Sequence, residues 1–355
     1  MAGPLAKYAF INAKLRARIS QILPDDLFVQ CAKAPSVEAV LAMLRDTPFS
    51  SLEEIYSSTG DLKQAELALL KSEIDLYKNV RNSMPQDAAA PVEALLVRFE
   101  TDNLKHAIRL FFDRTIRHRS IERGRHYVLY EQILHDIPID VIVNAKHFDE
   151  IAGVCGHTPY EPIIRKFGPT VESDKSLFRL EIGLDHYYYE NLLVSIQRLS
   201  DQDRKVALRL IGVEIDLQNI SWIIRFKEFQ EMSLDVLINT LIPGGFSVDR
   251  PVIDDLYRAQ NVTSALSDFL KDQYPGLSTL LSAKTSDSAS RLLLINRVLE
   301  EVRKQEIHHI LSGYPFTIGI LLAYFLLKHD ELRKIDMVLN AKHFGKDAER
   351  IESLL

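Results

Sequence analysis

The chain has 355 residues, too many for one ordinary hydrophobic core, so two or three domains are expected. Hydrophobic residues make up 46% and charged residues 26% of the sequence, a balance that excludes an intrinsically disordered chain. The formal net charge of −6 argues against a surface built as a whole to attract nucleic acid. The sequence has only two cysteines, which excludes a disulfide framework and suits a cytoplasmic protein.

The sequence contains no segment typical of a signal peptide or a membrane span. The first 20 residues mix apolar positions with Lys7, Lys14 and Arg18, so a continuous apolar region is missing. The longest nearly uncharged segment, 314–327, is 14 residues long, whereas a spanning helix needs about 20. We therefore expect the segment 314–327 to be a core helix.

Glycine and proline are sparse, at 14 each, and alternating strand patterns are nearly absent, so an all-α chain is predicted. In chain order, helices are predicted at 2–23, 36–44, 51–56, 61–84, 91–113, 127–135, 139–144, 148–154, 160–167, 176–199, 201–231, 233–241, 251–258, 262–271, 277–284, 287–311, 316–339 and 346–355. Ser36 and Ser51 are predicted N-caps, the latter with Glu54 in a capping box. Pro91 and Pro251 suit first-turn positions.

One helical segment, 206–229, recurs twice in degraded form and carries three polar residues inside its apolar stripe. The pattern is an acid, an Asn three residues later and an Arg six residues further, at Asp216, Asn219 and Arg225. A shift of 116 residues toward the N-terminus aligns it with Glu100, Asn103 and Arg109. A shift of 115 residues the other way gives Glu331, with Lys334 and Asn340 in place of the Asn and the Arg.

A second sequence feature recurs at nearly the same spacing as the acid, Asn and Arg pattern. Thr47-Pro48, Thr158-Pro159 and Tyr274-Pro275 each separate two short predicted helices, with Pro spacings of 111 and 116. The two markers together indicate three repeats, with domains predicted at 1–120, 121–240 and 241–355. Each domain would join short helices to an antiparallel hairpin of two long helices.

The repetition bears on chemistry. Catalysis rarely needs the same acid, Asn and Arg in two domains, whereas a structural contact recurs whenever its domain does. We therefore predict that these side chains stabilise the repeated fold by bonding to one another or to a neighbouring turn. The sequence also lacks a phosphate-binding loop, and no catalytic residue, metal ligand or cofactor is predicted.

The chain has one dense basic stretch, which contains Arg114, Arg117, Arg119, Arg123 and Arg125. It is either a solvated linker or a contact for an acidic protein surface or an anionic membrane face. No aromatic residue interleaves with these arginines before Tyr127, which disfavours nucleic-acid binding.

Four segments carry a resemblance: Tyr8–Ala17, Glu100–Arg109, Glu214–Arg225 and Gly319–Tyr324 leading into the helix at Glu331. In order and spacing the chain resembles the C subunit of the bacterial and archaeal V-type or A-type ATPases, which corresponds to the d subunit of the eukaryotic V-ATPase. The resemblance implies an all-helical funnel of three similar domains about a pseudo-threefold axis, with a central cavity.

The resemblance also implies a function. The chain would be a non-catalytic socket at the cytoplasmic face of the membrane, coupling the central-stalk shaft to the membrane rotor ring during ATP-linked proton or sodium transport. The residues leave two alternatives open: a helical scaffold of solenoid type, and a hydrolase that uses Cys155 with His157 or the Asp185-His186 region.

Overall fold

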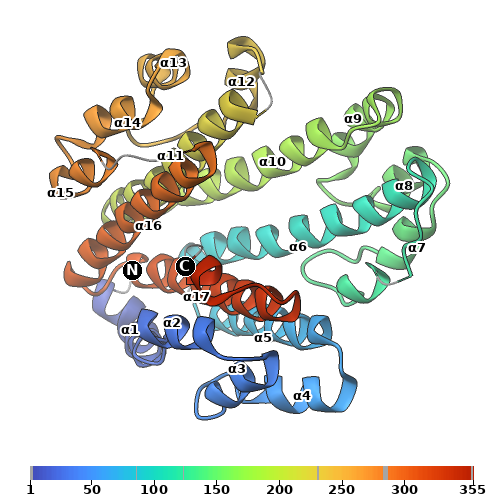
Figure 1. Cartoon of the computed structure of the whole chain (residues 1–355), viewed down its shortest axis with the longest axis horizontal. Coiled ribbons are helices and arrows are strands. Elements are labelled where there is room, and N and C mark those ends of the chain that lie inside the picture. Colours follow the sequence, from blue (N-terminus) through green and yellow to red (C-terminus); the bar gives the residue numbers. More distant parts are fainter. Residues whose placement is uncertain (1–2, 85, 123, 230–231, 283–286, 353–354) are drawn as a thin grey trace. The chain divides into compact units, whose positions relative to one another are not determined.

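The computed structural model describes residues 3–84, 86–122, 124–229, 232–282, 287–352 and 355. Within these ranges the chain forms eighteen α-helices and two short 3₁₀ helices and has no strand (Figure 1). The predicted all-α class is confirmed. The chain divides into two compact units, and α10 (Phe178–Gln197) and α17 (Gly319–His343) each include a boundary between them.

The first unit comprises Met1–Ser20 and Ile196–His329. Two of its long helices, α11 and α16, pack along each other (Figure 1). Three short helices, α13, α14 and α15, follow α11 and pack in sequence. The helices of this unit outside α10 and α17 are α1 (Pro4–Ile19), α11 (Asp201–Phe229), α12 (Leu234–Thr240), α13 (Arg250–Arg258), α14 (Val262–Leu270), α15 (Pro275–Ser278), η2 (Thr279–Ser282) and α16 (Ser288–Ser312).

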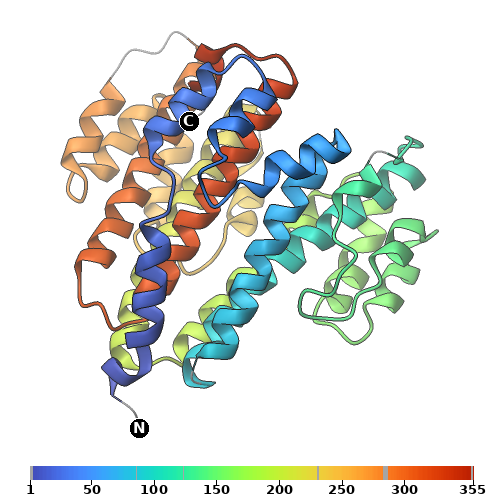
Figure 2. The ribbon, with the colours of Figure 1, turned by 90° about the horizontal axis from the view of Figure 1, so that it is seen from below.

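The second unit comprises Gln21–Ser195 and Asp330–Ser353. Helices α5 and α6 form an antiparallel hairpin, visible side by side in Figure 2. The helices of this unit outside α10 and α17 are α2 (Asp25–Lys33), α3 (Val37–Met43), α4 (Ser51–Thr59), α5 (Leu62–Ser83), α6 (Gln86–Thr115), η1 (Gly124–Tyr127), α7 (Ile139–Asn144), α8 (Phe148–Val154), α9 (Glu161–Asp174) and α18 (Ala348–Glu352).

Two apolar clusters stabilise different parts of the second unit. One joins α6 to α7, α8, α9 and α10, with Phe111 and Phe148 in edge-to-face contact. The other joins α2, α3, α4 and the start of α5 to the C-terminal part of α17, which contributes Ile335, Val338 and Leu339. The first and last parts of the sequence therefore share one core.

Two predictions about helix positions are wrong. Helix α2 was not predicted, although Pro24 at its N-cap and Asp25 and Asp26 in its first turn are ordinary helix-start signals. The helix predicted at 127–135 is absent, because after η1 the chain runs in bends and extended segments up to Pro138. Most other predicted helices are present, with ends displaced by a few residues, and α9 continues through Pro169 to Asp174.

Two predictions about helix ends also need correction. Ser51 lies inside α4 rather than at its N-cap, because the preceding Ser50 already has helical dihedral angles and makes no capping bond with its side chain. Pro91 lies inside α6, which begins at Gln86, whereas Pro251 occupies the first turn of α13 as predicted. Ser36 is a true N-cap, since its hydroxyl oxygen accepts the Ala39 amide at 3.3 Å.

The two serines provide a matched test. We expect Ser36→Ala to destabilise the second unit by about 1 kcal/mol, because the alanine leaves a first-turn amide of α3 without its acceptor. Ser50→Ala should change stability by only a few tenths of a kcal/mol, because its hydroxyl caps nothing. Calorimetric unfolding of the two variants measures both values, and equal losses would contradict the assigned caps.

Candidate functional site: the three joints between signature helices and short-helix modules

The repeated polar residues lie where a long helix meets a group of short helices. We call α6, α11 and α17 the signature helices. The short helices form an N-terminal module (21–59, with α2–α4), a middle module (129–174, with α7–α9) and a third module (242–282, with α13–α15 and η2). A joint is the set of polar contacts between a signature helix and the entry to a module.

The acid of joint 1 is Glu100 on α6, a buried carboxylate. Its Oε2 accepts the backbone amides of Leu134 and His135, both at 2.7 Å. Its Oε1 accepts the Tyr160 hydroxyl at 2.9 Å, and Nδ1 of His135 lies 2.6 Å away. These donors replace the water that an ionised carboxylate loses on burial. They also keep residues 134 and 135 out of the predicted helix.

The second residue of joint 1, Asn103, forms two hydrogen bonds with one backbone position. Its Nδ2 donates to the Leu129 carbonyl at 2.8 Å, and its Oδ1 accepts the Leu129 amide at 2.8 Å. An amide side chain thus satisfies both backbone groups of a residue outside any helix. The sequence predicted a contact to a neighbouring turn, and the structure places that turn 26 residues away.

Joint 2 repeats this arrangement on α11. The Asp216 carboxylate accepts the amides of Phe246 at 3.1 Å, Ser247 at 2.6 Å and Val248 at 3.1 Å. Burial raises the pKa of Asp216, and the three amides act against that rise. Asn219 donates to the Ile242 carbonyl at 2.8 Å and accepts the Ile242 amide at 2.9 Å.

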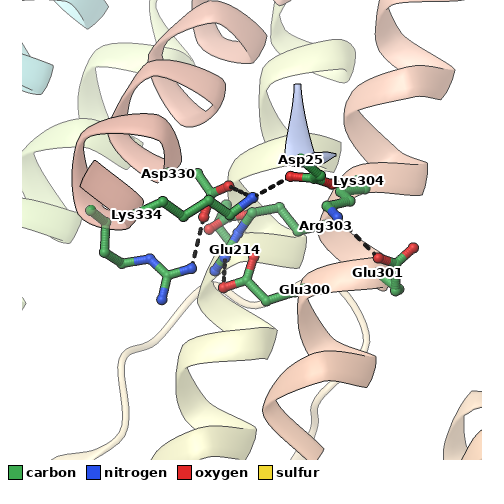
Figure 3. A network of polar contacts seen from close by, with 9 residues as sticks. Asp25, Glu214, Glu300, Glu301, Arg303, Lys304, Asp330 and Lys334 are labelled. Atoms are coloured by element: carbon green, nitrogen blue, oxygen red, sulfur yellow. Dashed lines mark hydrogen bonds and ion pairs between the residues drawn. The ribbon is translucent and has the colours of Figure 1, made fainter. Parts of the chain in front are cut away.

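Joint 3 differs in its partner and in its chemistry. Glu331 on α17 accepts the amide of Leu23, at the entry to the N-terminal module, at 2.8 Å. At the Asn position, Lys334 binds Asp25 and Asp330, both at 2.8 Å, as Figure 3 shows. The acid-to-backbone contact is therefore present at all three joints, whereas an ion-pair network replaces the two-bond Asn contact at joint 3.

The third position of the signature is separate from the joints. Arg109 is half-exposed and binds Glu181 on α10 at 2.6 Å, and Arg225 is exposed on α11. Asn340, at the equivalent place on α17, donates to Glu66 on α5 at 2.8 Å. The acid and the Asn thus act together, and the Arg does not join them.

A second set of charges in the first unit, partly buried around Glu306, was not predicted from the sequence. Glu306 on α16 binds Arg209 through both carboxylate oxygens, at 2.8 and 2.6 Å, and accepts the Tyr274 hydroxyl at 2.7 Å. Arg303 joins Glu214 on α11 at 2.8 Å and Glu300 at 3.1 Å (Figure 3). Spacing gives no signal for the Arg209–Glu306 and Arg303–Glu214 pairs because their partners are 97 and 89 residues apart.

Two of the segments that carry the resemblance meet in the first unit. The Tyr8 hydroxyl donates to Asp203 at 2.8 Å, and the same carboxylate accepts the Ile318 amide at 2.9 Å. Gly319, directly after this contact, allows close packing, since a Cβ there would lie 2.7 Å from Val206 and 2.8 Å from Ile310. These residues fix α1 and the start of α17 against α11.

The nucleophile considered for a hydrolase is unsuited to that role. Cys155 is fully buried, and burial raises the pKa of its thiol to about 12, with Glu100 and Glu161 adding to the shift. The thiol therefore stays protonated at neutral pH, whereas the thiolate is the nucleophile. His157 is exposed, and Asp185 binds the ammonium group of Lys105 at 2.7 Å.

Two further kinds of feature are absent from the described part of the chain. In those ranges, no group of three or more His, Cys, Asp or Glu side chains is arranged to hold a metal ion. Among the helices of the same ranges, none is both long and apolar enough to cross a bilayer.

The basic stretch is only partly available for binding. Arg114 donates to the carbonyls of Val143 and Ala145, and so stabilises the end of α7. Arg117 binds Asp113 at 3.2 Å within its own helix turn, and Arg119 is exposed. Arg123 and the side chain of Arg125 lie outside the described residues. Among the described arginines of this stretch, Arg117 and Arg119 are therefore the ones available to bind a partner.

The described residues form an all-helical protein in which the buried acids of three long helices bind the protein's own backbone. The family model described as ATP synthase (C/AC39) subunit matches residues 11–354, so the chain belongs to that family.

Similar curated proteins are named as the C subunit of the A-type ATP synthase. The protein of Methanosphaera stadtmanae is 23% identical over 335 residues, covering 94% of this chain and 84% of that protein. The protein of Pyrococcus horikoshii is 25% identical over 349 residues, covering 98% and 90%. The protein of Methanocaldococcus jannaschii is 21% identical over 359 residues, covering 100% and 88%. The resemblance inferred from the four sequence segments is confirmed.

Joint 2 can be tested next to the single tryptophan, Trp222 on α11. Asn219→Ala leaves the buried amide and carbonyl of Ile242 unpaired, so we expect the free energy of unfolding to fall by about 2–4 kcal/mol. Urea unfolding followed by Trp222 fluorescence measures it. Asn239→Ala is the control, because this exposed Asn bonds a carbonyl of its own helix. A small loss at Asn219 matching the control would contradict the role of joint 2.

Gly245 provides a steric test of the same joint. A Cβ at this position would lie 2.1 Å from Oδ1 of Asp216. We expect Gly245→Ala to displace the carboxylate from the three amides and lower the urea midpoint of the first unit, whereas Gly276→Ala meets nothing within 4 Å and should be tolerated. Similar midpoints for both variants would contradict the assignment.

The Glu306 network predicts a pH dependence. Burial by itself would raise the pKa of Glu306, but the hydrogen bonds and charge of Arg209 and the Tyr274 hydroxyl outweigh it and lower the pKa below 4.5. The stabilisation is therefore complete above about pH 4.5 and is lost as the pH falls through the folded-state pKa. We expect the difference in unfolding free energy between wild type and Glu306→Gln to shrink from pH 7 to pH 4. A constant difference would argue against the network.

Proposed function

We propose that this chain is the non-catalytic C subunit of an A-type rotary ATP synthase, a socket that couples the central shaft to the membrane rotor ring. The observation that carries the proposal is the family match over residues 11–354, supported by relatives that align with 94% or more of the chain. Partial matches would be compatible with a shared domain in an unrelated protein, but these matches include all three signature helices.

The joints support a mechanical role. A part that transmits torque has to resist deformation, and joints 1 and 2 each fix a long helix to a short-helix module through buried, directional contacts. We infer three similar domains, with boundaries near residues 120 and 240, arranged about a pseudo-threefold axis around a central cavity. The contact of the third signature helix with the N-terminal module supports this arrangement, because it links the last repeat to the first.

The same contact weighs against the solenoid scaffold. In an open stack of repeats, the last repeat has no following neighbour and presents a polar capping face. Here the C-terminal part of α17 supplies Ile335, Val338 and Leu339 to the core of the N-terminal module. The protonated, buried thiol of Cys155 likewise favours a structural role over the hydrolase alternative.

Purification from membranes tests the proposal. The tagged chain should co-purify from detergent-solubilised membranes with rotor-ring and central-stalk subunits, and the isolated chain should not hydrolyse ATP. Native mass spectrometry and peptide identification reveal the partners. Stable complexes that contain this chain and no rotary-ATPase component would contradict the proposal.

The exposed arginines provide a narrower test. If Arg117 and Arg119 bind an acidic partner surface, the double reversal to Glu should weaken assembly about tenfold or more and make it more sensitive to salt. Arg165→Glu is the control, because this exposed arginine pairs with Glu161 on its own helix. Unchanged assembly of the double variant would assign the stretch to a solvated linker.

A further inference from the structure

Joint 3 differs from joints 1 and 2 in the length of chain between its signature helix and its module. In joints 1 and 2, the signature helix binds backbone groups at the entry to a module that follows it closely, at sequence separations of 26 to 35 in joint 1 and 23 to 32 in joint 2. In joint 3, Glu331 and Leu23 are 308 residues apart. If the contacts of joint 1 or 2 break, the short chain segment between the signature helix and its module keeps the two close, so that they bind again readily. No short segment links α17 to the N-terminal module in this way.

Joint 3 also lacks the most directional contact of the other two. Asn103 and Asn219 each bind one residue's amide and carbonyl at fixed geometry. Lys334 instead binds Asp330 on its own helix and Asp25 on the module. The Lys334 side chain is 6% exposed but that of Asp25 is 62% exposed, so water competes for the ion pair that Lys334 forms across this joint.

Joint 3 also includes the Lys334 ammonium group, which lies 5.6 Å from the centroid of the Phe28 ring on α2, and a large apolar contact. Ile335, Val338 and Leu339 of α17 lie in the same buried cluster as side chains of α2, α3 and α4. Figure 2 shows these N-terminal helices beside the C-terminal part of α17. Apolar contact stabilises by area and has little directionality, so the module and the helix can separate and pack again along one continuous face.

We propose that joint 3 is a reversible opening point, at which the N-terminal module separates from the C-terminal part of α17 as one cooperative segment while joints 1 and 2 stay closed. Closure restores the Leu23–Glu331 bond and the ion pair of Asp25 with Lys334. The opening is a conformational device of the fold, and it does not depend on the proposed function.

Native-state hydrogen exchange of the full chain tests the opening directly. We expect the helix amides of α2–α4 to exchange at least about tenfold faster than those of α7–α9 and of α13 and α14, with a common opening free energy for the first group. Equal protection of the three groups in wild-type protein would overturn the proposal without any variant.

A pair of lysine variants assigns the effect to joint 3. Lys334→Met keeps the apolar stem and removes the ion pair with Asp25, so exchange of α2–α4 should rise several-fold further while α13 and α14 stay unchanged. Lys105→Met is matched, because Lys105 is also buried and binds two carboxylates, Asp102 and Asp185, away from joint 3. An equal rise in α2–α4 exchange in both variants would overturn the assignment.

Discussion

A buried carboxylate that accepts backbone amides from a non-helical segment is the contact on which the rest of this structure depends. Placing Asp216 or Glu100 on the apolar side of a long helix is unfavourable unless donors replace the lost water. Amides at the entry to a module also lack helical partners. The carboxylate needs donors and the amides need an acceptor, so one contact meets both needs. It also fixes where along the signature helix the module begins.

The Asn three residues after the acid fixes the orientation of the segment that enters the module, whereas the acid fixes its position. Because its side-chain amide matches a backbone amide in donor and acceptor, Asn103 and Asn219 accept one residue each in one alignment. Because the acid and the Asn are three residues apart, they lie on the same face of the helix. Together they specify where along the helix the module's entry segment binds and in which direction it runs. The exposed position of Arg225 shows that the third residue of the signature has no part in this.

Helical periodicity was readable in the sequence, but the partners of the signature residues were not. Asp216 binds amides 30 to 32 residues away in an irregular segment, and backbone amides carry no residue-specific signal. The helix predicted at 127–135 failed for the same reason, because the Glu100 contact overrides local preference at Leu134. Lys334 looked like a loss of the pattern, whereas it replaces an amide contact with a charged one. The Pro markers correspond to a local equivalence in two repeats, where the hydroxyls of Thr47 and Thr158 each donate to the carbonyl three residues back.

The shared core of the N-terminal module and α17 has a consequence for synthesis. A ribosome makes residues 21–59 long before Ile335, Val338 and Leu339 of their core, which emerge nearly 300 residues later. At translation rates of about 5–20 residues per second, the apolar side of the module waits at least about 15 seconds for its covering helix. Helices α2–α4 are thus made long before their core is completed, and during that interval their apolar side has no covering helix from α17.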